Sequence, residues 1–198
     1  MPMRKDLQVI FDIIPPNSKI LDLGCGEGVL LNGLIKRKKA SGLGIEVSME
    51  KIKSCLEYGI SVLQEDLNEG LKDFQKNSFD YVILSQTLEY IANPFYLIQE
   101  MLRVGKKCIV SFENIANWKN RISFLFKGTL KRERTDIDYL FSAKRIQILT
   151  VKKFLTFCAN YNIKICNNIY LPINKSNLTR NFPNLFSQIA IFILKGSD

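Results

Sequence analysis

Short apolar runs alternate along the chain with segments whose apolar residues recur at helical spacing. Residues 20–23, 42–46 and 79–84 are apolar runs of strand length. Residues 3–14 and 27–37 instead collect their apolar side chains on one helical face. Regular alternation of this kind favours an α/β fold, in which helices cover both faces of a mostly parallel sheet.

The same patterns predict the remaining elements of a seven-stranded sheet. Ser48 and Thr150 are suited to N-cap two further helices, and Pro94 suits the first turn of a third. The helix after Ser48 is expected to turn Leu56 toward the core. A polar loop rich in Asn, Lys and Ser is expected between the last two strands. The four further strands are expected at residues 61–63, 107–112, 163–170 and 189–194.

The alternation stops after the fifth strand. Residues 114–147 are irregular and basic, apart from an amphipathic pattern around Trp118, Ile122 and Leu125. We interpret this segment as an insertion or cap within one domain that spans residues 1–198. A chain of 198 residues is long enough for one domain with a sizeable core.

Positive charge is concentrated in one part of the sequence. The net charge is +9, and residues 119–153 carry ten Lys or Arg against three acidic residues. This patch fits nucleic-acid phosphates, a membrane surface with Trp118 and Phe124 inserted, a partner protein, or a solvated face. No nucleic-acid-binding motif accompanies the charge, so nucleic acid is not an expected partner. If a protein docks here, neutralising the basic residues within 131–134 weakens that complex.

Several function classes are excluded by what the sequence lacks. No apolar run approaches the roughly 20 residues that cross a bilayer, and no signal-peptide core follows the first residues. A cytoplasmic protein without a membrane span is therefore expected. The absence of histidine and of any Cys-x-x-Cys pair excludes Ser-His and Cys-His catalytic pairs, and no metal site is expected. We interpret all five cysteines as small buried hydrophobes. They are Cys25, Cys55, Cys108, Cys158 and Cys166.

The first predicted strand runs into a turn that carries three glycines, Gly24, Gly26 and Gly28. Glycine lets a backbone approach a ligand closely, as nucleotide sites require. The spacing is G-x-G-x-G and not the G-x-G-x-x-G of dinucleotide sites. Asp22 and Glu27 flank the glycines and would repel a pyrophosphate. A cationic or zwitterionic ligand fits better, and S-adenosylmethionine carries both a sulfonium and an ammonium group.

Polar side chains also end two other predicted strands. Glu46 ends the second strand, 18 residues after Gly28. A carboxylate at that position of a βαβ unit can accept hydrogen bonds from ribose hydroxyls. Ser85 and Gln86 follow the strand at 79–84, at the carboxyl edge where open α/β sheets bind ligands. The sequence therefore predicts a nucleoside-containing ligand at this edge.

These motifs resemble those of a known class of protein. The segment from Asp22 to Gly28 is similar to the first motif of the class I S-adenosylmethionine-dependent methyltransferases. Other segments resemble the MetW family of methionine biosynthesis proteins within that class. The similarity extends over residues 4–126 and resumes at 149–154. The segments that carry it include Arg4-Lys5-Asp6-Leu7, Ser85-Gln86-Thr87-Leu88 and Met101-Leu102-Arg103-Val104-Gly105.

The resemblance implies a fold and a cofactor. The fold is a Rossmann-like, doubly wound sheet of seven mostly parallel strands, with the last strand antiparallel. The cofactor is S-adenosylmethionine or S-adenosylhomocysteine. Asp66 is expected to bond the adenine amino group and Leu67 to meet the ring, while Ser85 and Gln86 face the methionine moiety. The expected cofactor-binding residues are Asp22, Gly24, Cys25, Gly26, Glu27, Gly28, Glu46, Val47, Asp66, Leu67, Ser85 and Gln86.

The resemblance also implies a role and a partner. Members of the family are associated with a homoserine O-acyltransferase, which needs them for its activity. Many methyltransferases of this class place Glu-His where this chain has Glu89 and Tyr90, so these two are the candidates for an acid/base role. Two functions stay open. One is an accessory subunit that binds S-adenosylmethionine, and the other is an active small-molecule methyltransferase with its own acceptor. The lack of a recognisable acceptor motif favours the first.

Overall fold

The computed structural model describes residues 3–129, 147–173 and 178–196. The basic residues within 131–134 therefore lie outside the described part of the chain, as does most of the second half of the predicted insertion. Across the described ranges, no helix has both the length and the apolar character needed to cross a membrane.

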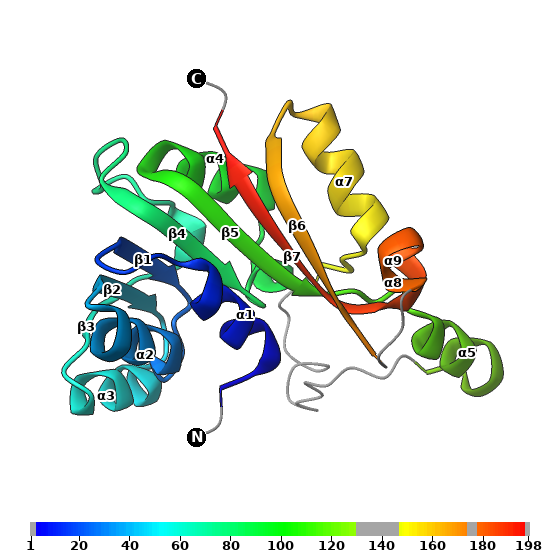
Figure 1. Ribbon diagram of the computed structural model, residues 1–198, viewed down its shortest axis with the longest axis horizontal. Coiled ribbons are helices and arrows are strands. Elements are labelled where there is room, and N and C mark those ends of the chain that lie inside the picture. The colour runs from blue at the N-terminus through cyan, green and yellow to red at the C-terminus, as the bar shows by residue number, and fades with distance from the viewer. Residues whose placement is uncertain (1–2, 130–146, 174–177, 197–198) are drawn as a thin grey trace.

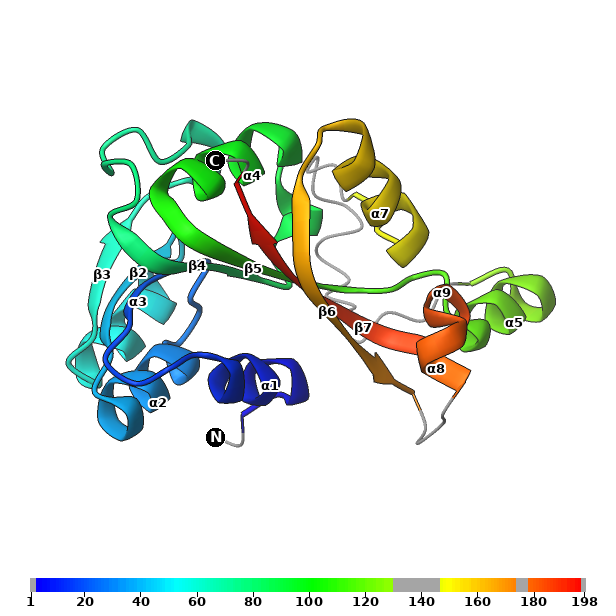
Figure 2. The same ribbon diagram turned by 45° about the horizontal axis from the view of Figure 1, so that its top comes forward.

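The described residues form one twisted sheet of seven strands (Figures 1 and 2). The strand order is β3-β2-β1-β4-β5-β7-β6. The first five strands run parallel, and β7 is antiparallel to both of its neighbours. The fold expected from the sequence is confirmed. The strands are β1 (Lys19–Leu23), β2 (Ser41–Glu46), β3 (Ser61–Gln64), β4 (Phe79–Ser85), β5 (Gly105–Glu113), β6 (Lys164–Pro172) and β7 (Ser187–Lys195).

Helices cover both faces of this sheet. On one face, Leu31 of α2 packs in a fully buried cluster that includes Ile20 of β1. On the other, Met101 of α4 and Phe154 of α7 belong to a cluster that includes Leu21. Adjacent residues of β1 serve opposite faces because side chains alternate along a strand. The helices of the two layers are α1 (Lys5–Ile13), α2 (Val29–Lys38), α3 (Met49–Glu57), α4 (Pro94–Val104) and α7 (Val151–Asn160).

Local sequence signals set the helix starts. The Asn93 side chain accepts a hydrogen bond from Tyr96 N at 3.1 Å, just before Pro94 at the first helical position of α4. Thr150 caps α7 in the same way, as expected, because its side chain accepts from Lys153 N at 3.1 Å. Ser48 holds the cap position of α3 but makes no side-chain hydrogen bond there.

The structure corrects four expectations. The helix expected at 27–37 begins at Val29, because Gly28 adopts a left-handed φ of 74°. The polar loop expected between the last strands contains two short helices, α8 (Leu178–Asn181) and α9 (Pro183–Phe186). Leu56 is 59% exposed, since α3 packs beside the edge strand β3. Cys166 is exposed because it lies on β6, the strand at the opposite edge of the sheet.

The amphipathic helix expected around Trp118 is present as α5 (Trp118–Lys127). Its buried residues are Asn120 and Ser123. Leu125 and Phe126 are 76% and 78% exposed. The helix projects beyond the sheet, near α8 and α9 (Figures 1 and 2). Much of the apolar surface of α5 is therefore directed outward.

Candidate ligand-binding site

The three glycines form a tight turn at the carboxyl end of β1. All three have positive φ, at 68°, 59° and 74° for Gly24, Gly26 and Gly28. The amides of Gly24 and Cys25 both donate to Ile45 O, at 2.8 and 3.1 Å, which fixes the turn against the end of β2. A Cβ atom added at Gly26 would meet nothing within 4 Å. The backbone at Gly26 therefore borders open space, as a ligand-binding turn requires.

Glu46 joins this turn to the end of β2. Its Oε2 accepts from Gly26 N at 2.9 Å, and its Oε1 accepts from Val47 N and Ser48 N at 3.0 Å each. A carboxylate has about four acceptor sites, and these bonds occupy three of them. The side chain is 7% exposed. Oε2 can therefore accept one further hydrogen bond, such as that of a ribose hydroxyl, without releasing the backbone.

Asp22 lies at the end of β1 and is 3% exposed. Burial raises the pKa of its carboxyl to about 7, an effect that nearby Arg4 opposes and Glu46 reinforces. A buried carboxyl group that loses its proton near neutral pH offers a site for a cation. The ammonium or sulfonium group of a ligand would stabilise its charged form.

The raised pKa of Asp22 makes the stability of the free protein depend on pH. Between about pH 5 and 6.5 the folded protein holds a proton at Asp22 that the unfolded chain, with an ordinary pKa of 3.8, has released. The free energy of unfolding should therefore fall by about 1.4 kcal/mol per pH unit as the pH rises through this window. Urea unfolding of wild type and Asp22→Asn at several pH values measures this, and the free energy of unfolding of wild type should fall relative to that of Asp22→Asn as the pH rises.

The control for this measurement is Asp73→Asn, which removes an exposed carboxylate. Its unfolding curve should run parallel to that of wild type across the same window. Parallel curves for Asp22→Asn as well would mean that Asp22 has an ordinary pKa.

Cys25 points away from the open side of the turn. A Cβ atom added at Gly44 would lie 2.5 Å from the Cys25 Sγ, so only glycine leaves room for this thiol behind the turn. Its Sγ also lies 4.0 Å from that of Cys55. Burial raises the pKa of both thiols. The Cys25 side chain thus packs inside, and only its backbone remains available to a ligand.

The far side of Glu46 presents apolar surface. Val47 and Met49 are 59% and 54% exposed, directly after β2. Asp66 is exposed, and its Oδ1 accepts from Asn68 N at 2.9 Å at the start of the short helix η1 (Leu67–Glu69). Leu67 is 8% exposed and belongs to the core. An adenine ring could lie on this surface, with Leu67 offering its backbone more than its side chain.

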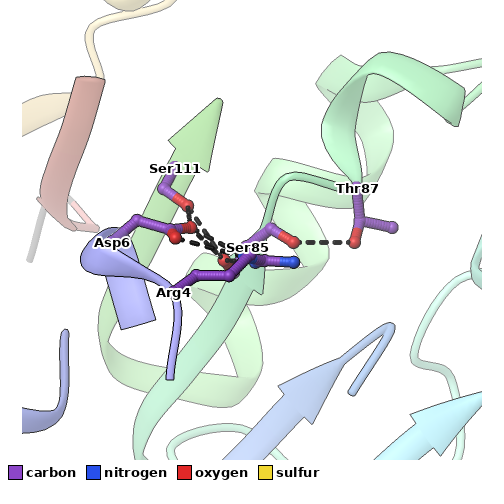
Figure 3. A network of polar contacts seen from close by, with 5 residues as sticks. All are labelled: Arg4, Asp6, Ser85, Thr87 and Ser111. Atoms are coloured by element: carbon purple, nitrogen blue, oxygen red, sulfur yellow. Dashed lines mark hydrogen bonds and ion pairs between the residues drawn. The ribbon is translucent and has the colours of Figure 1, made fainter. Parts of the chain in front are cut away.

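At the carboxyl end of β4, the side chain of Ser85 does not face open space. It lies in a buried network with Asp6, Arg4 and Ser111 (Figure 3). Gln86 follows with a φ of 51°, and its amide donates to Ser111 O at 2.8 Å. A left-handed non-glycine residue is uncommon and is found at functional sites. Of the two residues expected to face the methionine moiety, Gln86 is the more accessible.

Glu89 and Tyr90 lie in the short helix η2 (Leu88–Tyr90) next to this edge. Glu89 is 7% exposed, and its carbonyl oxygen accepts from Gln147 N at 2.7 Å. Tyr90 is half-buried. Glu27, on the glycine turn, is exposed. An acid/base role for Glu89 and Tyr90, and a ligand contact for Glu27, stay predictions.

Comparison with known proteins identifies the family. The model of the family described as "Methionine biosynthesis protein MetW" matches residues 4–194. The chain belongs to the MetW family. A curated relative from Rhodopirellula baltica, named "Bifunctional methionine biosynthesis protein MetXA/MetW", is 32% identical over 197 residues. That match covers 94% of this chain but 32% of the relative, so the MetW chain spans about a third of the fused protein.

Other similarities are to methyltransferases. The "Ubiquinone biosynthesis O-methyltransferase" of Methylococcus capsulatus is 32% identical over 93 residues, 44% of this chain and 39% of the relative. A solved S-adenosylmethionine-dependent methyltransferase from Mesorhizobium loti has a TM-score of 0.68 at 17% identity, covering 96% of each chain. One from Archaeoglobus fulgidus has a TM-score of 0.65 at 19% identity, covering 96% of this chain and 91% of that one. At these identities the two structures show that the MetW chain has the methyltransferase fold.

Sequence reasoning gave no role to several residues that the MetW fold brings to this edge. Arg4 and Asp6 were part of the family resemblance, but their spacing does not reveal that they meet β4 and β5. Thr87 contacts the glycine turn, because a Cβ atom at Gly24 would lie 2.7 Å from its Oγ1. A charged pair at the start of the first helix was the available signal for Arg4 and Asp6.

Proposed function

We propose that this MetW protein binds S-adenosylmethionine or S-adenosylhomocysteine at the glycine turn, and that it acts in the cytoplasm with a homoserine O-acyltransferase. The observation that supports ligand binding best is Glu46, whose carboxylate joins Gly26 to β2 and retains an acceptor site beside open space. The methyltransferase fold supports the same cofactor.

The charges at this edge favour such a ligand. Asp6, Asp22 and Glu46 are all at least nine-tenths buried there, with the guanidinium of Arg4 near Asp6 and Asp22. Three buried carboxyl groups and one guanidinium leave the edge short of positive charge, which a sulfonium and an ammonium supply. Calorimetric titration of S-adenosylmethionine and S-adenosylhomocysteine into the purified protein tests this. Micromolar binding is expected, and no binding of either would refute the proposed ligand.

The fused relative supports the partner. In the protein from Rhodopirellula baltica, the MetW part is joined to a part named MetXA. In this chain α5 exposes Ile122, Leu125 and Phe126, at helical spacings of three and four residues. Exposed apolar side chains gathered in this way are typical of protein–protein contact sites. We therefore place the acyltransferase on α5.

The double variant Leu125→Ser, Phe126→Ser should keep its fold but lose the partner. Both side chains are more than three-quarters exposed, so the free chain gives up little packing. Removing two central apolar contacts should weaken acyltransferase binding by about 30-fold or more. Surface-immobilised homoserine O-acyltransferase gives the dissociation constants. Leu56→Ser, at a leucine 59% exposed on α3, is the control and should bind as wild type does. Equal affinities for all three proteins would exclude α5 as the contact.

An active methyltransferase with its own small-molecule acceptor is the alternative. The similarity to ubiquinone O-methyltransferases favours it. Methyl transfer from a sulfonium needs mainly positioning and exclusion of water, so the lack of histidine does not oppose it. Acceptor-dependent production of S-adenosylhomocysteine, lost in Glu89→Gln, would support this function. No turnover of any methionine-pathway acceptor, with or without the acyltransferase, would favour the accessory role.

A further inference from the structure

A groove of about 380 Å³ lies between α1 and α2, two helices that pack side by side (Figures 1 and 2). Gln8 lines this α1–α2 groove from one side, and Val29, Asn32 and Arg37 line it from the other. Residues spaced by three and four positions share one face of a helix, so the residues of α2 form a single stripe. The volume is in the range of binding sites for small molecules.

The middle of the stripe on α2 is a glycine. Gly33 lies inside the helix, where glycine is one of the least favourable residues. A Cβ atom there would lie 3.2 Å from Met3 Cε and 3.3 Å from Arg37 Nη2. Because Gly33 has no side chain, the ends of Met3 and Arg37 can come together over the helix backbone. The floor of the α1–α2 groove is therefore bare backbone.

One end of the α1–α2 groove is positively charged. Lys36 and Arg37 line it, and both side chains are exposed. In the part of the chain that the structure describes, neither side chain forms an ion pair. Lys38 differs from them, because its Nζ donates to Phe11 O at 2.5 Å and to Ile14 O at 2.6 Å and so caps the end of α1. Lys36 and Arg37 are the cations that an anion in the groove would meet.

The guanidinium of Arg37 is positioned by an aromatic ring. Its Cζ lies 4.2 Å from the centroid of the Phe11 ring. Phe11 is 8% exposed and belongs to the core, so the ring is a fixed surface. A guanidinium that stacks on a ring through its face keeps its N–H groups available at its edges. A planar carboxylate can accept two parallel hydrogen bonds from such an edge.

The acidic residue on this side of α1 does not cancel the positive charge. Asp12 is exposed and does not line the groove. Its Oδ1 accepts a hydrogen bond from Gln8 Nε2 at 3.0 Å, one helical turn away. One negative charge beside the groove faces the two positive charges of Lys36 and Arg37. The balance at this end therefore favours an anionic ligand.

The opposite end of the α1–α2 groove is apolar. Val29 lies there, at the first position of α2, and Met3 lies over the middle of the groove. Eight residues of α-helix, from Val29 to Arg37, rise about 12 Å. A ligand that fills this length has an anionic end and an apolar body. Its charged end also lies more than two helical turns away from the glycine turn, which Gly28 ends.

We propose that the α1–α2 groove binds a small carboxylate with an aliphatic body, at a site separate from the glycine turn. Arg37 and Lys36 receive the carboxylate. Met3, Val29 and the backbone of Gly33 contact the aliphatic part. The proposal does not depend on the binding of S-adenosylmethionine, since none of these residues belongs to the site proposed for that ligand.

Octanoate and octanamide are a direct pair of probes, because they share one aliphatic chain and differ in the charge of the head group. NMR titration of the full chain, with the backbone amides of Asn32 and Gly33 as reporters, gives the dissociation constant of each compound. Wild type should bind octanoate about 10-fold more tightly than octanamide. In Arg37→Met this preference should fall to about 2-fold or less, while octanamide binds as it does to wild type.

Two further variants test the place of binding. Leucine favours a helix, and a Cβ atom at Gly33 has its closest contacts with the ends of two flexible side chains, so Gly33→Leu should fold. Its side chain occupies the groove and should abolish the octanoate-dependent shift at Asn32. Lys39→Met is the control, because it removes an exposed positive charge just after α2 and outside the groove. This variant should keep the full preference for octanoate.

Several results would overturn the proposal. Equal affinities of wild type for octanoate and octanamide would mean that no positive group receives the carboxylate. An unchanged preference in Arg37→Met would exclude the guanidinium, and octanoate binding to a folded Gly33→Leu as tight as to wild type would exclude the groove. Absence of a saturable shift at Asn32 and Gly33 in wild type would mean that the groove does not bind carboxylates of this kind.

Discussion

Glu46→Ala is expected to weaken the binding of S-adenosylmethionine and S-adenosylhomocysteine by about 100-fold or more. The substitution removes the acceptor for a ribose hydroxyl, a charge-assisted hydrogen bond whose loss costs about 1.5–3 kcal/mol. It also releases the amide of Gly26, which Glu46 Oε2 holds at 2.9 Å. A turn that is no longer held in place must be ordered again on binding, which adds to the loss. Calorimetric titration of the variant measures the change.

Two variants distinguish this effect from a general loss of charge. Glu50→Ala removes an exposed carboxylate from the first turn of α3 and should leave the affinity unchanged. Glu46→Gln keeps one carbonyl oxygen but directs an amide NH₂ at backbone donors, so its affinity should lie between those of wild type and Glu46→Ala. Unchanged affinity in Glu46→Ala would place the ribose elsewhere.

Gly28→Ala should destabilise the protein much more than Gly26→Ala, although both glycines belong to the same turn. Gly28 has a φ of 74°, and a Cβ atom there would lie 2.6 Å from Ile60 Cδ1 and 3.0 Å from Cys55 Sγ, both in the core. The left-handed backbone costs roughly 1–2 kcal/mol for a residue with a Cβ. Overpacking of the core costs about 1–3 kcal/mol more. Thermal unfolding should show a midpoint lower by about 5–15 °C.

Gly26→Ala is the matched control for the core contact. Its φ of 59° carries the same backbone cost, but a Cβ atom there would meet nothing within 4 Å. Its unfolding midpoint should fall by only about 2–5 °C. We assign the open space at Gly26 to the ligand. The added methyl group should therefore reduce the affinity for the ligand more than it reduces the stability of the fold. Equal midpoints for both variants would mean that Ile60 and Cys55 move aside without cost.

Most of the fold could be predicted from the sequence because its signals are local. Each parallel strand is a short apolar run, and Thr150 and Pro94 start their helices as their chemistry requires. The glycine turn and Glu46 could be predicted for the same reason, since both lie within one βαβ unit. The cofactor roles assigned to the individual residues there stay predictions.

What could not be predicted depends on contacts between distant parts of the chain. The hydrogen bond between Ser85 and Asp6 joins residues that are 79 positions apart. The spacing of apolar residues along the chain does not indicate such a pairing. The outward apolar face of α5 has the same spacing as a core-facing one, so the pattern alone does not give its direction. Cys166 and Leu56 are exposed because their elements lie at sheet edges, and edge position follows from strand order.

The distance between the network's members along the chain also sets when the binding edge can be assembled. The hydrogen bond from Ser111 to Asp6 closes a loop of 105 residues. Because the chain is synthesised from its N-terminus, Asp6 is made long before Ser85 and Ser111. Its carboxylate therefore stays in water until β4 and β5 have both formed. The glycine turn and Glu46 come together earlier, within β1, α2 and β2. The part of the site that contains Arg4 therefore forms last, and it forms only when the parallel strands of the sheet are in place.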